Sequence, residues 1–484
     1  MRAYPFFMKS RFIFIFLLFF HSLWAQNTET SSLYIKGFLY LCDKLEAVHP
    51  NIYANLSGLE YEKWKKTCEA EVSLTKNEVD FKLLLAKFLA KIGDSHTRVI
   101  ISENKHFPVT IRLFNGKYYV VAAENRDSIG FAIDYINGVS IAQVQLILSE
   151  YISAENEDCK MFYLTECLRS PTWLSLINNG RILDTLSITM NNDKTISMKA
   201  MEKCTVYLDT AYSEIYRKKQ SSFFYRIDTL NNLCILYFNA MEDRACLCRT
   251  KKQLYSRKYL KQPLFSEFLT QMFQEMRWHN IQNLVIDLRN NQGGNSMLGD
   301  QLLYFIADKK EVANKITMNT KTRISKDYKK QRSSSPHIRY IYEENKSFDN
   351  YTHTNEKWFW ELENPKSIWY IKDTTCRFHG QAYVLVSNST YSAASDLAWY
   401  MSCLNIPLIG ERTAQAINCF GDYLEFVMPN SKIPFTVSCK YFYDKNANTE
   451  NRVNPTIPVL YDYEDLRHGY DKPMEKVLEI IRKN

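Results

Sequence analysis

The stretch that decides the fold is NLVIDLRNNQGGN, residues Asn283–Asn295. Its first half is a continuous apolar run, typical of a strand that is buried on both faces. The run leads directly into Gly293 and Gly294, and a helical pattern begins at Met297. Strands that alternate with helices favour a layered α/β domain. Ligand sites in such sheets lie at the carboxyl ends of strands, so the glycines mark a candidate site, with a plain Gly-rich turn as the alternative.

A second junction between a strand and a helix carries a serine. The segment Tyr383–Asp396 reads YVLVSNSTYSAASD, and its apolar strand turns into a helix near Ser392. Small residues next to Ser392 leave room for a substrate carbonyl, and a helix N-terminus favours negative charge on the attacked oxygen. Serine is also a common N-cap residue, so capping is the alternative role for Ser392.

A serine nucleophile needs a base, and the base needs an orienting acceptor. His96 is the candidate base, and it lies in the loop GDSHT, which follows a helical pattern that Gly93 should end. Glu450, just before a predicted strand, is one of many carboxylates that could orient His96. Taken singly, a histidine and a glutamate in loops are also typical of the solvated surface.

The first 25 residues have the pattern of an export signal. Basic Lys9 and Arg11 precede an apolar run, and Ala25 stands before polar residues. A membrane anchor is the alternative, but the uninterrupted apolar run is shorter than the roughly 20 residues that a spanning helix needs. We therefore expect residues 1–25 to be a signal peptide, with the mature chain in the periplasm or outside the cell.

The rest of the chain divides by its hydrophobic periodicity. Residues 26–103 have helical spacing, and residues 104–203 alternate with a period of two and include an Asn115-Gly116 hairpin turn. Residues 204–484 alternate apolar strands with helices. The sequence does not predict the course of residues 308–380, and it shows no internal repeat.

Composition excludes several classes of function. The chain has 484 residues, of which 46% are hydrophobic and 24% charged, in the range of folded multidomain proteins. Its formal net charge of +8 is not gathered on one element, so no nucleic-acid partner is expected. Cys246 and Cys248 form a lone C-x-C, and the nine histidines are scattered, so neither a metal nor a cofactor is expected.

Together these stretches resemble the C-terminal-processing serine peptidases, the tail-specific protease family, and most closely its tricorn-like Ser-His-Ser-Glu branch. Gly93–Thr97 resembles the branch's Gly-Asp-x-His-Thr loop, Asp287–Gly294 resembles the family's oxyanion-hole motif, and Tyr391–Ala394 resembles its nucleophile turn. Met428–Ser431 and the segment from Glu450 to Pro455 fit the family's final segments.

The chain also departs from the family pattern. Ser395 stands where the family usually carries Glu, and Arg452 and Thr456 replace a Gly and an Asp. In the Ser-Lys branch a lysine lies about 25 residues after the nucleophile, whereas this chain has Ile417 in that region. A Ser-Lys dyad is therefore not expected.

The resemblance implies a multidomain α/β and α+β fold: a helical N-terminal region, a PDZ-like β domain at 104–203 and a catalytic α/β domain of the ClpP/crotonase type at 204–484. It implies that Ser392 attacks a peptide carbonyl, that His96 is the general base, and that Ser95 and Glu450 orient and stabilise the imidazolium. The oxyanion hole would be formed by backbone N–H groups at Gly293, Gly294 and Ala393.

The function expected from sequence is thus an exported serine endopeptidase that acts on proteins or peptides. It would need no cofactor, bind no nucleic acid and have no stable membrane span in the mature chain. The sequence indicates no oligomeric state. The alternative from another class is a catalytically inactive protein of the same fold that binds a peptide or a hydrophobic ligand.

Overall fold

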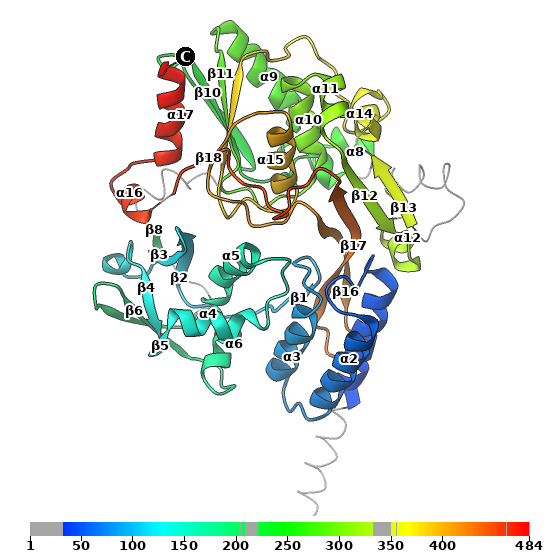
Figure 1. Ribbon diagram of the computed structural model, residues 1–484, viewed down its shortest axis with the longest axis vertical. Helices are drawn as coiled ribbons and strands as arrows, with labels where there is room; N and C mark the ends of the chain where they lie inside the picture. Colours follow the sequence, from blue (N-terminus) through cyan, green and yellow to red (C-terminus); the bar gives the residue numbers. More distant parts are fainter. Residues whose placement is uncertain are drawn as a thin grey trace, which may run out of the picture.

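The computed structural model describes residues 32–202, 206–208, 221–248, 250–332, 350–354, 356–460 and 462–483. The predicted signal peptide, residues 1–25, lies outside them. Figure 1 shows three parts: the blue N-terminal helices, a cyan region of small sheets and short helices, and a larger part coloured green to red. Two sheets of the larger part carry the elements around the candidate site.

The central sheet has six strands in the order β18-β15-β14-β11-β10-β9. All neighbouring pairs are parallel except β9 with β10. The strands are β9 (Phe223–Asp228), β10 (Leu233–Phe238), β11 (Asn283–Asp287), β14 (Gln381–Val386), β15 (Leu408–Gly410) and β18 (Ile457–Pro458). The strands expected near Leu284 and Tyr383 are thus neighbours, and their carboxyl ends meet at one edge of the sheet.

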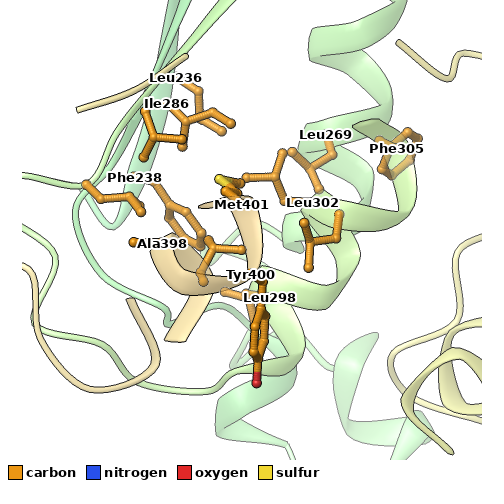
Figure 2. Close-up of a cluster of buried hydrophobic side chains, with 14 of the residues drawn as sticks. Leu236, Phe238, Leu269, Ile286, Leu298, Leu302, Phe305, Ala398, Tyr400 and Met401 are labelled. Atoms are coloured by element: carbon orange, nitrogen blue, oxygen red, sulfur yellow. The ribbon is translucent and has the colours of Figure 1, made fainter. Parts of the chain in front are cut away.

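Helices cover both faces of this sheet. On one face lie α9 (Phe265–Trp278), α10 (Met297–Ile306) and α15 (Ala393–Cys403). Figure 2 shows Ile286 of β11 in the same buried cluster as Leu302 of α10 and Met401 of α15. On the other face, α17 (Lys472–Lys483) packs Val477 against the strands. This two-sided burial explains the continuous apolar runs in the sequence.

The second sheet is antiparallel and connects the N-terminal helices to the large part. Its order is β1-β17-β12-β13, with β16 also paired to β17. The strands are β1 (Arg98–Val99), β12 (Met318–Arg323), β13 (Asn350–Thr354), β16 (Cys419–Val427) and β17 (Pro434–Asp444). A helix over residues 32–48, α2 (Gly58–Ser73) and α3 (Glu78–Ala90) share a buried apolar cluster with β16 and β17. Because Arg98 pairs with Thr436, the loop before β1 lies along this sheet.

The middle region contains two small sheets, β2-β3-β8 and β5-β4-β6-β7. Their strands are β2 (Val109–Phe114), β3 (Lys117–Ala123), β4 (Ile133–Ile136), β5 (Val139–Ser140), β6 (Thr185–Met190), β7 (Thr195–Lys199) and β8 (Tyr207–Leu208). Asn115 and Gly116 form the expected turn, both with positive φ. The region is more helical than its period-two alternation predicts, because several helices lie between β5 and β6. Its helices are η1 (Arg126–Ser128), α4 (Ile141–Ser149), α5 (Glu157–Cys167), α6 (Pro171–Leu174) and η2 (Ser175–Ile177).

The remaining elements lie mostly in the connections of the large part. They are η4 (Ala245–Leu247), α8 (Lys251–Leu254), α11 (Lys309–Lys315), α12 (Lys326–Arg332), α14 (Glu356–Glu363) and α16 (Tyr463–Arg467). Within the described ranges, no helix has the length and apolar character to cross a bilayer. The same residues contain no group of three or more His, Cys, Asp or Glu side chains placed to hold a metal ion.

Candidate active site

Ser392 lies on a sharp turn between β14 and α15. Its backbone has φ 53° and ψ −136°, a combination that is sparsely populated by residues other than glycine. The turn is fastened to the segment after β11, because Tyr391 N–H donates to Asn291 O (3.0 Å) and Thr390 Oγ1 donates to Leu288 O (2.9 Å). Ser392 makes no side-chain capping bond with α15. Its hydroxyl is therefore not used as a helix cap.

His96 faces this hydroxyl from the loop between α3 and β1. Its Nε2 lies 3.2 Å from Ser392 Oγ, and its side chain is buried, with the residue 8% exposed. Two bonds fix its backbone: His96 N–H donates to Asp94 Oδ1 (3.0 Å), and Thr436 Oγ1 donates to His96 O (2.7 Å). Burial lowers the pKa of His96 below its ordinary 6.5, although the negative charge of Asp94 opposes the shift. His96 is accordingly neutral at pH 7 and able to accept a proton.

Asp94 connects the histidine loop to His49, which follows the first N-terminal helix. Its Oδ2 lies 3.2 Å from His49 Nε2, and both side chains are buried. Burial alone would raise the pKa of Asp94, but the hydrogen bond and charge of His49, together with the charge of His96, hold it at about 2. Asp94 is thus a permanent negative charge beside His96, and it favours the imidazolium that would form when His96 takes up a proton.

Tyr391 links the Ser95 hydroxyl to the ring of His96, and the sequence analysis did not identify Tyr391 as a site residue. Tyr391 Oη lies 3.2 Å from His96 Nδ1 and 3.5 Å from His96 Nε2, and it also hydrogen-bonds Ser95 Oγ. Ser95 Oγ donates to Glu155 Oε1 (3.1 Å), and Ser95 N–H donates to Glu155 Oε2 (3.2 Å). The structure therefore places Ser95, His96 and Ser392 in one network together with Tyr391 and Glu155.

Glu450, which the family resemblance implies would orient His96, lies apart from this network. Its side chain is 61% exposed, and its Oε2 lies 3.9 Å from Arg412 Nη2. The same oxygen accepts a hydrogen bond from Asn454 Nδ2 at 3.2 Å. The carboxylate next to the Ser-His loop is instead Glu155, from the connection between α4 and α5. No motif marks Glu155, because only the packing of the middle region brings it to Ser95.

The paired glycines lie directly against the nucleophile turn. Gly293 has φ +90°, and a Cβ added there would lie 2.6 Å from Ser392 Cβ and 2.9 Å from Ala393 N. Its own N–H donates to Asn291 Oδ1 (2.8 Å), so Gly293 is not an available oxyanion donor. In the described part of the chain, the N–H groups of Gly294 and Ala393 have no hydrogen-bond partner. These two groups are the candidate donors, and Gly293 provides the close approach of the two turns.

The buried side chain of Arg289, in the glycine motif, binds two carboxylates. Arg289 is 2% exposed and forms hydrogen bonds to both carboxylate oxygens of Asp287 (3.0 and 2.8 Å) and of Asp471 (2.6 and 3.0 Å). Asp471 also accepts a hydrogen bond from Met474 N–H at the start of α17. The charged residues of the glycine motif thus join the end of β11 to the start of α17.

The first two lysines after Ser392 in the sequence, Lys432 and Lys440, have other partners than Ser392. Ile417 is buried, 1% exposed. Lys432 Nζ donates to Pro429 O (2.7 Å), and Lys440 Nζ lies 2.6 Å from Asp422 Oδ2. Both ammonium groups therefore have other partners, and the group that contacts Ser392 Oγ is His96.

Part of the chain matches a known family, and its fold is similar to that of solved structures. Residues 258–459 match the model of peptidase family S41. Mature CPAF in complex with lactacystin is similar in structure, with a TM-score of 0.64 and 13% identity over 94% of this chain and 100% of that chain. Mature CPAF alone gives 0.62 and 12% over 94% and 98%. The photosystem II D1 C-terminal processing protease gives 0.44 and 12% over 93% and 97%.

At these identities the likeness to CPAF shows a shared fold. None of the curated proteins matches the chain by sequence. The family match covers the glycine motif and the nucleophile turn, and family S41 comprises the C-terminal-processing peptidases that the motifs resemble. Residues 258–459 are therefore a peptidase family S41 domain, and this domain makes the chain a serine-type peptidase.

Proposed function

We propose that the chain is an exported serine endopeptidase that cleaves protein substrates through an acyl-enzyme on Ser392, with His96 as the general base. The observation that carries the proposal is the 3.2 Å contact between Ser392 Oγ and His96 Nε2 on a turn where the hydroxyl caps no helix. Peptidases of this kind are active with only these side chains and backbone donors, so no cofactor is required.

In the acylation step, His96 Nε2 takes the Ser392 hydroxyl proton while Oγ bonds to the substrate carbonyl carbon. The carbonyl oxygen becomes an oxyanion next to the Gly294 and Ala393 N–H groups, each worth about 3 kcal/mol when a donor of this kind is aimed correctly. The imidazolium is favoured by the charges of Asp94 and Asp422. It then gives its proton to the leaving amine as the C–N bond breaks, and water repeats the sequence to release the acid.

We further propose that the chain has the domain architecture of the tricorn-like branch. Residues 104–203 would be a PDZ-like β domain, and residues 204–484 a crotonase-like catalytic domain. Fold likeness to CPAF over 94% of this chain, which extends well beyond the family match, supports a multidomain peptidase architecture. The parallel β10, β11, β14 and β15, with helices on both faces, supports the catalytic assignment.

Export is proposed from the basic and apolar leader before Gln26. We expect the protein recovered from the periplasm or the medium to have an intact mass that begins near Gln26. A membrane-bound species whose mass retains residues 1–25 would replace the signal peptide with an anchor.

The peptidase proposal is tested by hydrolysis of an unfolded protein, reduced and carboxymethylated so that access to peptide bonds is not limiting. Wild type should cleave it, and Ser392→Ala and His96→Ala should not. Ser389→Ala is the matched control, because it removes a hydroxyl three residues earlier on the same turn and should keep wild-type turnover. A folded wild-type protein that binds the substrate without cleaving it would favour the inactive binding protein instead.

A further inference from the structure

The side chains of Tyr391, Ser95 and Glu155 form a continuous hydrogen-bonded relay that ends on His96 Nδ1. We propose that this relay holds His96 in the tautomer that can accept the Ser392 proton, in place of a carboxylate in direct contact with the imidazole. The inference deepens the proposed peptidase function and rests on it. Tyr391 and Glu155 are positioning residues, since they act through His96 and Ser95.

The direction of each hydrogen bond follows from the chemistry of Glu155. An ionised carboxylate can only accept, so Ser95 Oγ–H and Ser95 N–H both donate to Glu155, at 3.1 and 3.2 Å. The Ser95 oxygen then accepts from Tyr391 Oη–H, which leaves the Tyr391 oxygen to accept from His96 Nδ1–H, the nearer ring nitrogen at 3.2 Å against 3.5 Å for Nε2. With its proton on Nδ1, His96 presents the Nε2 lone pair to Ser392 Oγ.

Protonation of Glu155 would reverse the relay. A carboxylic acid donates to Ser95, Ser95 donates to Tyr391, and Tyr391 donates to His96 Nδ1. In this change the three relay protons each move one step toward Glu155, and one proton from solvent binds His96 Nε2. The Nε2–H tautomer cannot accept the Ser392 proton, so the enzyme is inactive in this form.

The surroundings of Glu155 place this reversal near neutral pH. The titratable groups that face it are Asp94 from the histidine loop, Cys159 and Tyr163 of α5, Tyr391 from the nucleophile turn and Cys419 of β16. Burial and the negative charge of Asp94 raise the pKa of Glu155 to about 7. The pKa of His96 is shifted in the opposite direction, so the two groups should titrate separately.

Tyr391 could also serve only to fill space. It is buried and stacks on Phe162 at 5.6 Å between ring centroids and on His96 at 5.2 Å. Tyr391→Phe separates the two roles, because phenylalanine keeps the ring contacts and loses only the hydroxyl. Tyr118→Phe is the matched control, since the Tyr118 hydroxyl is buried and has no hydrogen-bond partner within the described residues.

The first test measures kcat for cleavage of the unfolded protein, and follows kcat/KM against pH. Tyr391→Phe should lower kcat by on the order of 10²-fold, the typical contribution of a correctly placed general base, and Tyr118→Phe should keep wild-type turnover. The acid limb of the wild-type profile should lie near pH 7, and in Glu155→Gln it should move below 6.5, where only His96 still titrates. Wild-type kcat in Tyr391→Phe, or a limb that moves in Glu450→Gln and not in Glu155→Gln, would overturn the relay.

The second test does not depend on activity. In protein with ¹⁵N-labelled histidine, the His96 resonances, assigned by their loss in His96→Ala, should report protonated Nδ1 and unprotonated Nε2 at pH 8. The opposite tautomer at pH 8 would overturn the relay even if the enzyme cleaves. Conversely, a wild-type protein with the expected tautomer but no cleavage would refute the peptidase function and leave the relay supported.

Discussion

Gly293→Ala adds one methyl group to the residue that packs against the nucleophile turn. Gly293 has φ +90°, and the new Cβ would lie 2.6 Å from Ser392 Cβ and 2.9 Å from both Ala393 N and Tyr391 O. Two of these three atoms belong to the backbone, so the contacts can be relieved only if the turn moves. A positive φ costs an alanine about 1–2 kcal/mol, and overpacking costs a further ~1–3 kcal/mol. The free energy of unfolding should therefore fall by roughly 2–5 kcal/mol.

Activity should fall by more than this loss of stability explains. Movement of the turn displaces the Ala393 N–H, and loss of one oxyanion donor lowers kcat by about 10²- to 10³-fold in other enzymes. Gly116→Ala is the control, because Gly116 has φ +73° and an added Cβ would meet no atom within 4 Å. Gly116→Ala should lower the free energy of unfolding only by the cost of the positive φ, about 1–2 kcal/mol, and leave kcat unchanged. Urea unfolding and kcat on the unfolded substrate measure both effects, and wild-type kcat in folded Gly293→Ala would refute the reasoning.

Three further predictions follow from individual side chains. Arg289→Met removes the guanidinium from the carboxylates of Asp287 and Asp471 and should lower the free energy of unfolding by about 3–5 kcal/mol. Arg412→Met at the surface should cost less than about 1 kcal/mol in the same urea titration. Burial raises the pKa of Asp396 to about 7 in the folded protein. As pH rises from 4 to 7, the unfolded state therefore loses the Asp396 proton before the folded state does, and the free energy of unfolding of the wild type should fall. Asp396→Asn should flatten that dependence and be the more stable protein at pH 8. Lys432→Ala should keep most of the peptidase activity, and an inactive Lys432→Ala beside an active His96→Ala would return the Ser-Lys dyad.

Local sequence patterns were sufficient for the elements that carry the two turns. The apolar runs near Leu284 and Tyr383 predicted buried strands, and the structure has β11 and β14 there as parallel neighbours. Gly93 ends the helix before the histidine loop with φ +69°, as its position suggested. These features depend on backbone conformation and burial over a few residues, which sequence records directly.

Features that depend on packing between distant segments were not predictable in the same way. Glu155 reaches Ser95 only because the middle region packs its apolar core against Tyr391. Glu450 was the natural candidate from motif position, yet its contacts are with Arg412 and Asn454 at the surface. Tyr391 stood within the quoted nucleophile stretch, and the one available signal was a large phenol among small residues.

The central claim is that Ser392 is an activated nucleophile, and covalent labelling with a fluorophosphonate tests it most directly. The reagent adds to a serine that has a base and an oxyanion hole far faster than to an ordinary surface serine. Peptide mapping of the labelled wild-type protein should place the adduct on Ser392, with no adduct in Ser392→Ala and slow labelling in His96→Ala. A folded wild-type protein that takes up no label, or takes it up at Ser389 or Ser395, would contradict the account.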